Sequence, residues 1–283
     1  MTASLARVLL LGSGGMLGRA FAARLDRDGV SVDAWDVPAL DLTRADAVAD
    51  LPVARGGTVI NCAAWTDVDG AEAQEEAATV VNGHAVGWLA ERCHDAGATL
   101  VHFSTDYVFD GRATTPYPID HPRAPVNAYG RSKADGEVRL LGSGAEALLV
   151  RTSWLYAPWG KNFVKTMAAL GQSRDELRVV DDQRGRPTSA EGLVDTTLAL
   201  LEVGYRGIAH ATDGGECTWY ELAKAVVEQV APSCRVQPCA TEEFPRPAPR
   251  PAYSVLDLSE TETALGRALR PWADAVADVV TRL

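Results

Sequence analysis

The sequence predicts an α/β fold: a doubly wound parallel sheet followed by a smaller, loop-rich C-terminal part. Two observations indicate it. Over about the first 150 residues, short apolar runs alternate with longer amphipathic ones, and a glycine-rich turn follows the first apolar run. Such alternation implies right-handed crossovers and helices on both faces of a parallel sheet. After Thr152 the alternation ends, and prolines and glycines interrupt irregular segments.

The expected buried strands are Val8–Leu11, Val30–Trp35, Thr58–Asn61, Thr99–Ser104 and Ala147–Arg151. The expected helices between them are Leu17–Asp28, Glu72–Asn82, His84–Ala96 and Tyr129–Leu141. We place a dinucleotide-binding domain at residues 1–152 and a substrate-binding domain at 153–283, with the segment of about 178–204 folding back onto the first domain. Four prolines predict a loop over 244–253. A C-terminal helix, Asp274–Leu283, is expected to dock through Val276, Val279, Val280 and Leu283.

The composition of the 283-residue chain is that of an ordinary globular protein, with 47% hydrophobic and 23% charged residues. With 27 basic and 38 acidic residues the formal charge is −11, so the overall field does not attract nucleic acid or anionic lipid. The five cysteines form no CxxC pair, and we expect free thiols. No apolar run reaches the roughly 18 residues of a membrane span. We therefore expect a cytoplasmic protein with no nucleic-acid partner and no membrane partner.

A glycine-rich turn follows the first expected strand. Gly12, Gly15 and Gly18 form a G-x-x-G-x-x-G motif ahead of an amphipathic helix. The first glycine permits a tight turn, the second lets the backbone approach a pyrophosphate, and the third lets the helix pack on the strand. The helix N-terminus adds amide donors at Met16 and Leu17. A glycine-rich surface turn is the alternative, but the flanking strand and helix favour a dinucleotide site.

The acidic residue Asp36 follows the second expected strand, 18 residues after Gly18. This is near the distance at which an acid binds the adenosine ribose of a dinucleotide. No arginine stands beside Asp36 to take a 2′-phosphate, which favours NADH over NADPH. Asp41 and Leu42 lie farther along, where the adenine is expected. A surface aspartate at a strand end is the alternative for Asp36.

Tyr129 and Lys133 form a Y-x-x-x-K motif, whose spacing places both side chains on one helix face. A neighbouring ammonium favours the phenolate, so we expect Lys133 to lower the pKa of Tyr129 from its usual value of about 10. The phenol then serves as proton donor to a developing alkoxide. Ser104 and Thr105 lie at the end of a buried strand, at the edge where parallel sheets bind ligands, and the Thr105 hydroxyl can bond the same oxygen. A solvated helix face is the alternative for the motif.

These motifs resemble the dTDP-4-dehydrorhamnose reductase family, within the extended type of the short-chain dehydrogenase/reductase superfamily that handles nucleotide sugars. The resemblance spans nearly the whole chain and implies a Rossmann-like sheet with a smaller substrate domain. The matching segments are Leu10–Gly18, 61–69 (NCAAWTDVD), Ser104–Gly111, Asn127–Gly136, 151–156 (RTSWLY), 161–163 (KNF), 182–188 (DQRGRPT), Arg250–Asp257 and 270–272 (RPW).

The resemblance implies reduction of the C4 keto group of a dTDP-4-keto-6-deoxy sugar by NADPH or NADH. Tyr129 would give the proton, Lys133 would tune it and hold ribose, and Thr105 would polarise the carbonyl. The other implied cofactor residues are Ala63, Ala64, Thr66 and Asn82. The implied substrate residues are Val68, Ser104, Tyr107 and Trp154 at the sugar, and Asn162, Gln183 and Arg186 at the nucleotide diphosphate. A core role for Trp154 and a surface role for Arg186 are the alternatives.

The chain departs from the family pattern at a metal site. Some members carry a Glu two residues after the third glycine, which binds Mg²⁺ at a dimer interface, whereas this chain has Ala20 there. Glu191 stands where a second ligand would. We therefore expect no metal, and either a monomer or a homodimer. The five histidines are scattered along the chain, and we expect structural or surface roles for them.

Two other functions compete with the reductase. A nucleotide-sugar dehydratase or epimerase uses the same scaffold, but dehydratases that resemble this chain carry Asp-Glu where it has Asp106-Tyr107. A non-catalytic regulatory subunit would bind the dinucleotide without turnover and would not require Tyr129 and Lys133. Among reductase substrates, dTDP-4-dehydrorhamnose, giving dTDP-L-rhamnose, is the default. A deoxysugar of antibiotic biosynthesis, such as a streptose-type unit, would use the same residues.

Overall fold

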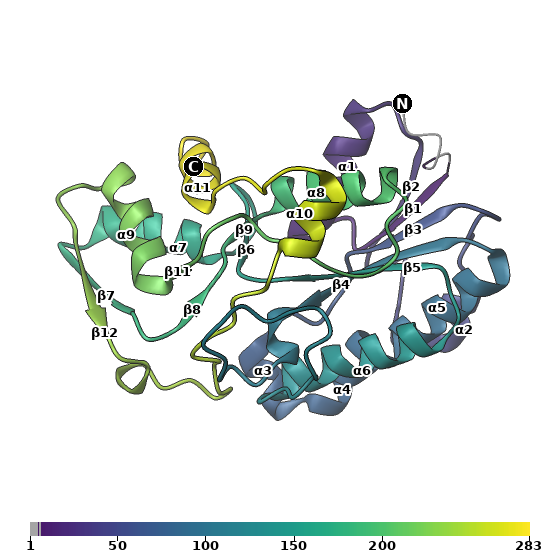
Figure 1. Ribbon diagram of the computed structural model, residues 1–283, viewed down its shortest axis with the longest axis horizontal. Coiled ribbons are helices and arrows are strands. Elements are labelled where there is room, and N and C mark those ends of the chain that lie inside the picture. Colours follow the sequence, from purple (N-terminus) through teal and green to yellow (C-terminus); the bar gives the residue numbers. More distant parts are fainter. Residues whose placement is uncertain (1–4, 6) are drawn as a thin grey trace.

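A six-stranded parallel sheet forms the centre of the N-terminal half of the computed structural model, which describes residue 5 and residues 7–283 (Figure 1). The strand order is β10-β5-β4-β3-β1-β2. The strands are β1 (Val8–Leu11), β2 (Val32–Trp35), β3 (Thr58–Asn61), β4 (Thr99–Thr105), β5 (Ala147–Thr152) and β10 (Gly207–His210). The predicted α/β class with a doubly wound parallel sheet is confirmed.

Helices cover both faces of this sheet (Figure 1). On one face lie α1 (Met16–Arg27) and α8 (Ala190–Glu202), which pack against each other; on the other lie α2 (Ala45–Ala49), α5 (Ala85–Ala96) and α6 (Ala128–Gly142). Because side chains alternate along a strand, Leu10 and Ile60 pack toward the α1 face, whereas Leu9 and Val59 pack toward the α5 face. The sheet therefore separates two apolar cores.

The five predicted strands are all present, with ends that agree within two residues. The sixth strand, β10, was not predicted, because it comes from the C-terminal half and pairs with β5. One predicted helix, Glu72–Asn82, is wrong as a single element. There α3 (Val68–Ala73) ends before Gln74, whose backbone leaves the helical region, and α4 (Glu75–Thr79) runs into the π-helical turn η1 (Val80–His84).

The C-terminal half packs three helices around one another and against a two-stranded sheet, at the left of Figure 1. The helices are α7 (Phe163–Ser173), α9 (Trp219–Val230) and α11 (Trp272–Val280), and the strands are β7 (Glu176–Val180) and β12 (Arg235–Cys239). The shorter elements are η2 (Asp106–Val108), β6 (Leu155–Tyr156), β8 (Arg184–Gly185), β9 (Thr188–Ser189), β11 (Cys217–Thr218), η3 (Thr241–Glu243) and α10 (Ser259–Leu265).

The C-terminal segments follow the sequence pattern in most respects. Residues 244–253 hold no helix and no extended strand, as predicted. Val276, Val279 and Val280 of α11 are buried, as predicted. The docking role expected for Leu283 is wrong: α11 ends at Val280, and Leu283 is 47% exposed. In the part of the chain that the structure describes, no helix has the length and apolar character needed to cross a membrane.

A buried ion pair fastens α6 to the sheet. The Glu137 carboxylate accepts hydrogen bonds from Arg151 of β5 at 2.9 and 2.7 Å and from the Ser104 hydroxyl of β4 at 2.6 Å. Both charged side chains are almost fully buried, with exposures of 1% and 0%. Burial alone would raise the pKa of Glu137, but Arg151, Ser104 and Arg123 lower it below its usual value. Glu137 is therefore held as a carboxylate at neutral pH.

Removing one member of this pair leaves an uncompensated buried charge. We expect Arg151→Ala to lower the free energy of unfolding by about 3–5 kcal/mol. The matched control is Arg139→Ala, which breaks the solvent-exposed pair with Asp135 on the same helix and should cost less than about 0.5 kcal/mol. Chemical denaturation measures both changes. Equal losses in the two variants would contradict the structural role of the buried pair.

Candidate active site

A cleft of about 870 Å³ opens at the carboxyl ends of the sheet strands. It includes residues that follow β1 and β3, between which the strand order reverses. In open α/β sheets this switch point is where ligands bind. The cleft continues from the glycine-rich turn to Trp154 and Trp219 of the C-terminal half. Both halves of the chain therefore contribute to one site.

The glycine-rich turn leaves no room for side chains at two of its positions. Gly12 has φ +74°, and a Cβ there would lie 2.6 Å from the Ala63 backbone nitrogen. A Cβ on Gly18 would lie 2.1 Å from the Gly12 carbonyl oxygen. Gly12 and Gly15 line the cleft, as do Met16 and Leu17, whereas Gly18 is not among the lining residues. No side chain caps the start of α1, so its first amides fit a pyrophosphate group.

The acid proposed for the ribose lies in the cleft beside this turn. Asp36 accepts hydrogen bonds from the backbone nitrogens of Gly14 at 2.5 Å and Val37 at 2.7 Å. Asp41 and Leu42 also line the cleft. Thr43 donates to the Asp41 carboxylate and lowers its pKa. The carboxylate of Asp36 is thus positioned by backbone donors, which suits an acceptor for hydroxyl groups.

The loop after β3 lines the same cleft with Ala63, Ala64 and Thr66. Asn82 is not among the lining residues and lies buried behind this loop. Its side-chain oxygen accepts from the Trp65 nitrogen at 2.9 Å, and its amide donates to the Trp65 carbonyl at 3.0 Å and to Ser132. Asn82 thereby fixes the backbone of the loop against α6.

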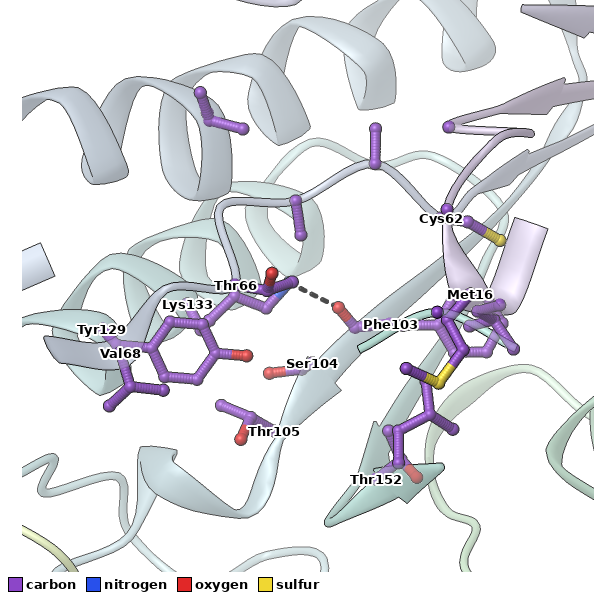
Figure 2. A pocket seen from close by; sticks show the side chains of 18 of the residues that line it. Met16, Cys62, Thr66, Val68, Phe103, Ser104, Thr105, Tyr129, Lys133 and Thr152 are labelled. Carbon is purple, nitrogen blue, oxygen red and sulfur yellow. Dashed lines mark hydrogen bonds between the residues drawn. The ribbon is translucent and has the colours of Figure 1, made fainter. Parts of the chain in front are cut away.

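The residues of the proposed catalytic set lie together in this cleft. Figure 2 shows the Tyr129 ring with its hydroxyl directed toward Ser104 and Thr105. Asn127 caps α6 by accepting from the Gly130 nitrogen at 2.7 Å, which places Tyr129 in the first turn. Lys133 lies one turn farther on and is buried, and its ammonium donates to the Phe103 carbonyl at 2.6 Å (Figure 2).

The pKa of the phenol moves opposite to the expectation from the motif. Burial and the nearby Asp106 carboxyl raise the pKa of Tyr129, and Thr105 offsets this only in part. Lys133 is not among the groups that shift the pKa of Tyr129, and its amine bonds the Phe103 carbonyl instead. Burial lowers the pKa of Lys133 itself to about 8, although Glu137 opposes that change. The expected acidification of Tyr129 is therefore corrected: the phenol is neutral.

Asp106 is a site residue that we did not predict. It is 2% exposed, and burial raises its pKa to about 7. The Thr105 hydroxyl donates to one carboxyl oxygen at 2.9 Å, whereas the other, Oδ2, has no hydrogen-bond partner within the described chain. Its place directly after Thr105 at the end of β4 was the available signal.

At the far end of the cleft, two tryptophans form a stack. The rings of Trp154 and Trp219 lie 3.6 Å apart between centroids, with planes 12° from parallel. Trp154 adopts the left-handed backbone conformation, with φ +48°, and its ring closely approaches Gly185. Val68 and Tyr107 also line the cleft, and the Tyr107 ring meets the Tyr129 ring edge-on at 6.0 Å. Nothing in the sequence indicated Trp219, which begins α9 in the other half.

Three residues expected at the nucleotide diphosphate are not among the cleft-lining residues. Asn162 caps α7 by accepting from the Lys165 nitrogen at 3.0 Å. Gln183 accepts from the Trp219 indole at 3.2 Å, and Arg186 donates to the Gly215 carbonyl at 2.7 Å. Each therefore has a structural partner, and their contact with a diphosphate stays a prediction. The unpredicted Lys161 does line the cleft and is exposed.

Comparison with known proteins gives consistent results. The family model described as "RmlD substrate binding domain" matches residues 6–283. The chain is 45% identical to a probable dTDP-4,6-dihydroxy-2-methyloxan-3-one 4-ketoreductase of Streptomyces antibioticus, over 96% of this chain and 94% of that protein. It is 41% identical to a dTDP-4-dehydrorhamnose reductase of Mycolicibacterium smegmatis, over 97% and 85%.

Solved structures give the same result. A dTDP-4-dehydrorhamnose reductase of Clostridium acetobutylicum superposes with a TM-score of 0.93 at 39% identity, covering 97% of this chain and 98% of that one. A dTDP-4-dehydrorhamnose reductase of Bacillus anthracis in complex with NADP superposes with a TM-score of 0.92 at 34% identity, covering 99% and 100%.

Proposed function

The chain belongs to the RmlD substrate binding domain family, that of the dTDP-4-dehydrorhamnose reductases, and from this premise we propose its substrate, its cofactor preference and the roles of its site residues. The protein is an NAD(P)H-dependent oxidoreductase that reduces the keto group of a dTDP-4-keto sugar. The observation that carries the assignment of roles is the convergence of Tyr129, Lys133 and Thr105 in the cleft that begins at the glycine-rich turn.

Tyr129 is the proton donor of the proposed mechanism. The nicotinamide supplies the hydride when it is bound. The Tyr129 hydroxyl gives its proton to the carbonyl oxygen as that oxygen becomes an alkoxide, and the raised pKa keeps the phenol in its acid form. Thr105 orients the same oxygen by turning to it the hydroxyl proton that it otherwise donates to Asp106 at 2.9 Å. The Tyr107 nitrogen, which donates to the Thr105 oxygen at 3.2 Å, helps to position this hydroxyl. Lys133, when charged, holds ribose hydroxyls.

Tyr129→Phe removes only the hydroxyl. We expect kcat to fall by about 10²–10⁴-fold, the usual contribution of a general acid, while cofactor affinity stays nearly unchanged. Oxidation of the reduced nicotinamide with a 4-keto sugar nucleotide measures the rate, and fluorescence titration measures the affinity. Tyr220→Phe on α9 is the matched control, outside the cleft. Near-normal turnover in Tyr129→Phe would count against the mechanism.

Lys133 should set the alkaline limb of the pH profile. Its lowered pKa of about 8 means that the amine loses its charge as the pH rises through that value, and ribose binding weakens. We expect kcat/KM to fall above about pH 8. Tyr129 does not titrate there, because its pKa is raised. In Lys133→Arg, whose side chain stays charged, the limb should move up or vanish even though the rate is lower. A limb that persists in Lys133→Arg would refute the assignment.

We propose a preference for NADH over NADPH, resting on Asp36. Its carboxylate lines the cleft, and a negative charge there favours ribose hydroxyls and repels a 2′-phosphate. The solved relative that binds NADP shows that a nicotinamide dinucleotide fits this fold. The preference of this chain for NADH over NADPH therefore rests on Asp36 alone.

Asp36→Ala should raise the use of NADPH relative to NADH by about tenfold or more, since a charge-assisted hydrogen bond contributes roughly 1.5–3 kcal/mol. The measurement is the ratio of kcat/KM for the two cofactors. Asp33→Ala, three residues earlier and exposed on β2, is the matched control and should leave the ratio unchanged. An unchanged ratio in Asp36→Ala would remove the ribose assignment.

We propose that no metal joins the site. At the position of the family's glutamate, Ala20 offers no ligand, and the Glu191 carboxylate is bound by the Arg282 guanidinium at 2.8 and 2.5 Å. Arg282 lowers the pKa of Glu191 and neutralises its charge. A guanidinium thus takes the place beside Glu191 that a cation would need. The oligomeric state, monomer or homodimer, is then independent of Mg²⁺.

The first proposed substrate is dTDP-4-dehydrorhamnose, reduced to dTDP-L-rhamnose. A related 4-keto-6-deoxy sugar of antibiotic biosynthesis is the second, because the relatives include a probable 4-ketoreductase of Streptomyces antibioticus and a dTDP-4-keto-6-deoxy-D-glucose reductase of Streptomyces niveus. Incubation with each keto sugar and each reduced nicotinamide, followed by NMR of the product, decides between them. Conversion without added reductant would instead indicate an epimerase or dehydratase.

A further inference from the structure

Behind the catalytic lysine lies a buried polar row that the reaction does not use. His102 and Asn61 are register partners on the adjacent strands β4 and β3, and both are 1% exposed. Alternation along β4 directs Leu100, His102 and Ser104 to the face that α6 covers. The helical spacing of Tyr129, Lys133 and Glu137 directs them back to that face. As a result, His102 Nε2 lies 3.5 Å from Lys133 Nζ.

The donors and acceptors in this row can be assigned from one backbone group. The Ala63 nitrogen can only donate, and it donates to Asn61 Oδ1 at 3.1 Å. The other end of the amide, Nδ2, is therefore the group that faces His102 Nδ1 at 3.2 Å, and an NH₂ group donates. Nδ1 must accept, so a neutral imidazole carries its proton on Nε2. The Nε2–H then points at the lysine.

The His102 imidazole is uncharged at neutral pH. It is buried, and burial together with the Lys133 charge holds the pKa of His102 well below its ordinary value. An Nε2–H group next to an ammonium places a donor against a donor. A neutral amine, by contrast, can accept from Nε2–H with its lone pair while it still donates to the Phe103 carbonyl at 2.6 Å. The uncharged amine can therefore form both hydrogen bonds, to His102 Nε2–H and to the Phe103 carbonyl, whereas the ammonium cannot accept the first.

We propose that Asn61 and His102 are positioning residues: Asn61 holds the imidazole as the Nε2–H tautomer, and that N–H favours the uncharged form of the Lys133 amine. The pair thereby places the ionisation of the proposed catalytic lysine within the range of physiological pH. This inference rests on the proposed function only in that it gives Lys133 a role in the reaction. It deepens that function by making reductase activity sensitive to alkaline pH.

Other ionisable groups near Lys133 and on the elements packed against α6 also bear on the ionisation of Lys133. Glu137 on α6 favours the ammonium and is itself neutralised by Arg151 of β5 and by Arg123. Among the charged or titratable groups of the other elements packed against α6, Asp106 and Tyr107 of η2 lie beside Tyr129. Glu72 of α3 accepts from the Ala128 nitrogen, and Glu75 of α4 pairs with Arg131. The η1 turn presents the neutral amide of Asn82 to Ser132. His102 is thus the neutral group that opposes the effect of Glu137 on the ionisation of Lys133.

The wild-type protein provides the first test. NMR of ¹⁵N-histidine-labelled protein distinguishes protonated from unprotonated ring nitrogens, and His102 is one of five histidines, identified by its loss in His102→Phe. We expect Nε2 protonated and Nδ1 unprotonated at neutral pH. A proton on Nδ1, or a doubly protonated ring, would overturn the proposal. This measurement needs neither substrate nor turnover.

The second test follows Lys133 directly. The chain has four lysines, so ¹³Cε-lysine labelling resolves the titration of Lys133, identified by its loss in Lys133→Arg. His102→Phe keeps the ring and removes both nitrogens, and it should move the lysine titration upward by about half to one pH unit. Asn61→Leu frees the imidazole to change tautomer and should move it in the same direction. His94→Phe, the same change on α5 outside the cleft, should leave it unchanged.

The outcomes separate this inference from the proposed function. An unchanged or lowered Lys133 titration in His102→Phe and Asn61→Leu would overturn the role of the pair, even if Tyr129→Phe abolishes turnover. If His102→Phe does not fold, Asn61→Leu and the wild-type tautomer still decide. In the active enzyme, the alkaline limb of kcat/KM should move upward with the lysine titration. If the Lys133 titration moves but the alkaline limb of kcat/KM does not, the proposal is also contradicted.

Discussion

The attachment of α6 to the sheet is the constraint on which the site depends. The buried Glu137–Arg151 pair, with Ser104 as a third partner, joins one helix to two central strands. Without it the helix could slide on an apolar surface, since burial alone does not fix register. Because Lys133 lies one turn and Tyr129 two turns before Glu137, this polar anchor fixes their depth in the cleft. Burying the Glu137 and Arg151 charges costs free energy, and in return the pair fixes the position of α6 on the sheet.

A second constraint lies at the glycine-rich turn. The backbone of Gly12 approaches that of Ala63 so closely that any side chain would collide, and Gly18 is fixed by the Gly12 carbonyl in the same way. Two strand ends are therefore drawn together at the switch point of the sheet. The space this leaves beside the first turn of α1 has free amides on one side and the Asp36 carboxylate on the other. Position and charge together define the dinucleotide end of the cleft.

The chemistry at the sugar end depends on burial more than on the overall charge of −11. Desolvation keeps the Tyr129 phenol protonated, brings the pKa of Asp106 to about 7 and that of Lys133 to about 8. These shifts arise because three ionisable groups from one helix and one strand end share a region that excludes water. The Y-x-x-x-K motif alone suggested a lowered pKa for the Tyr129 phenol. In the packed site the phenol stays protonated, and Asp106 and Lys133 are the groups that titrate near neutral pH.

The sequence by itself determined the sheet, the glycine-rich turn, the acid after β2 and the pairing of Tyr129 with Lys133, because each depends on residues close together along the chain. Strand ends agreed within two residues. Only the tertiary structure decided that β10 completes the sheet, that Trp219 stacks on Trp154, and that His102 faces Lys133. The direction of the Tyr129 pKa shift was also decided there. The physical reason is that desolvation and contacts between distant segments depend on how elements pack, which local spacing does not encode.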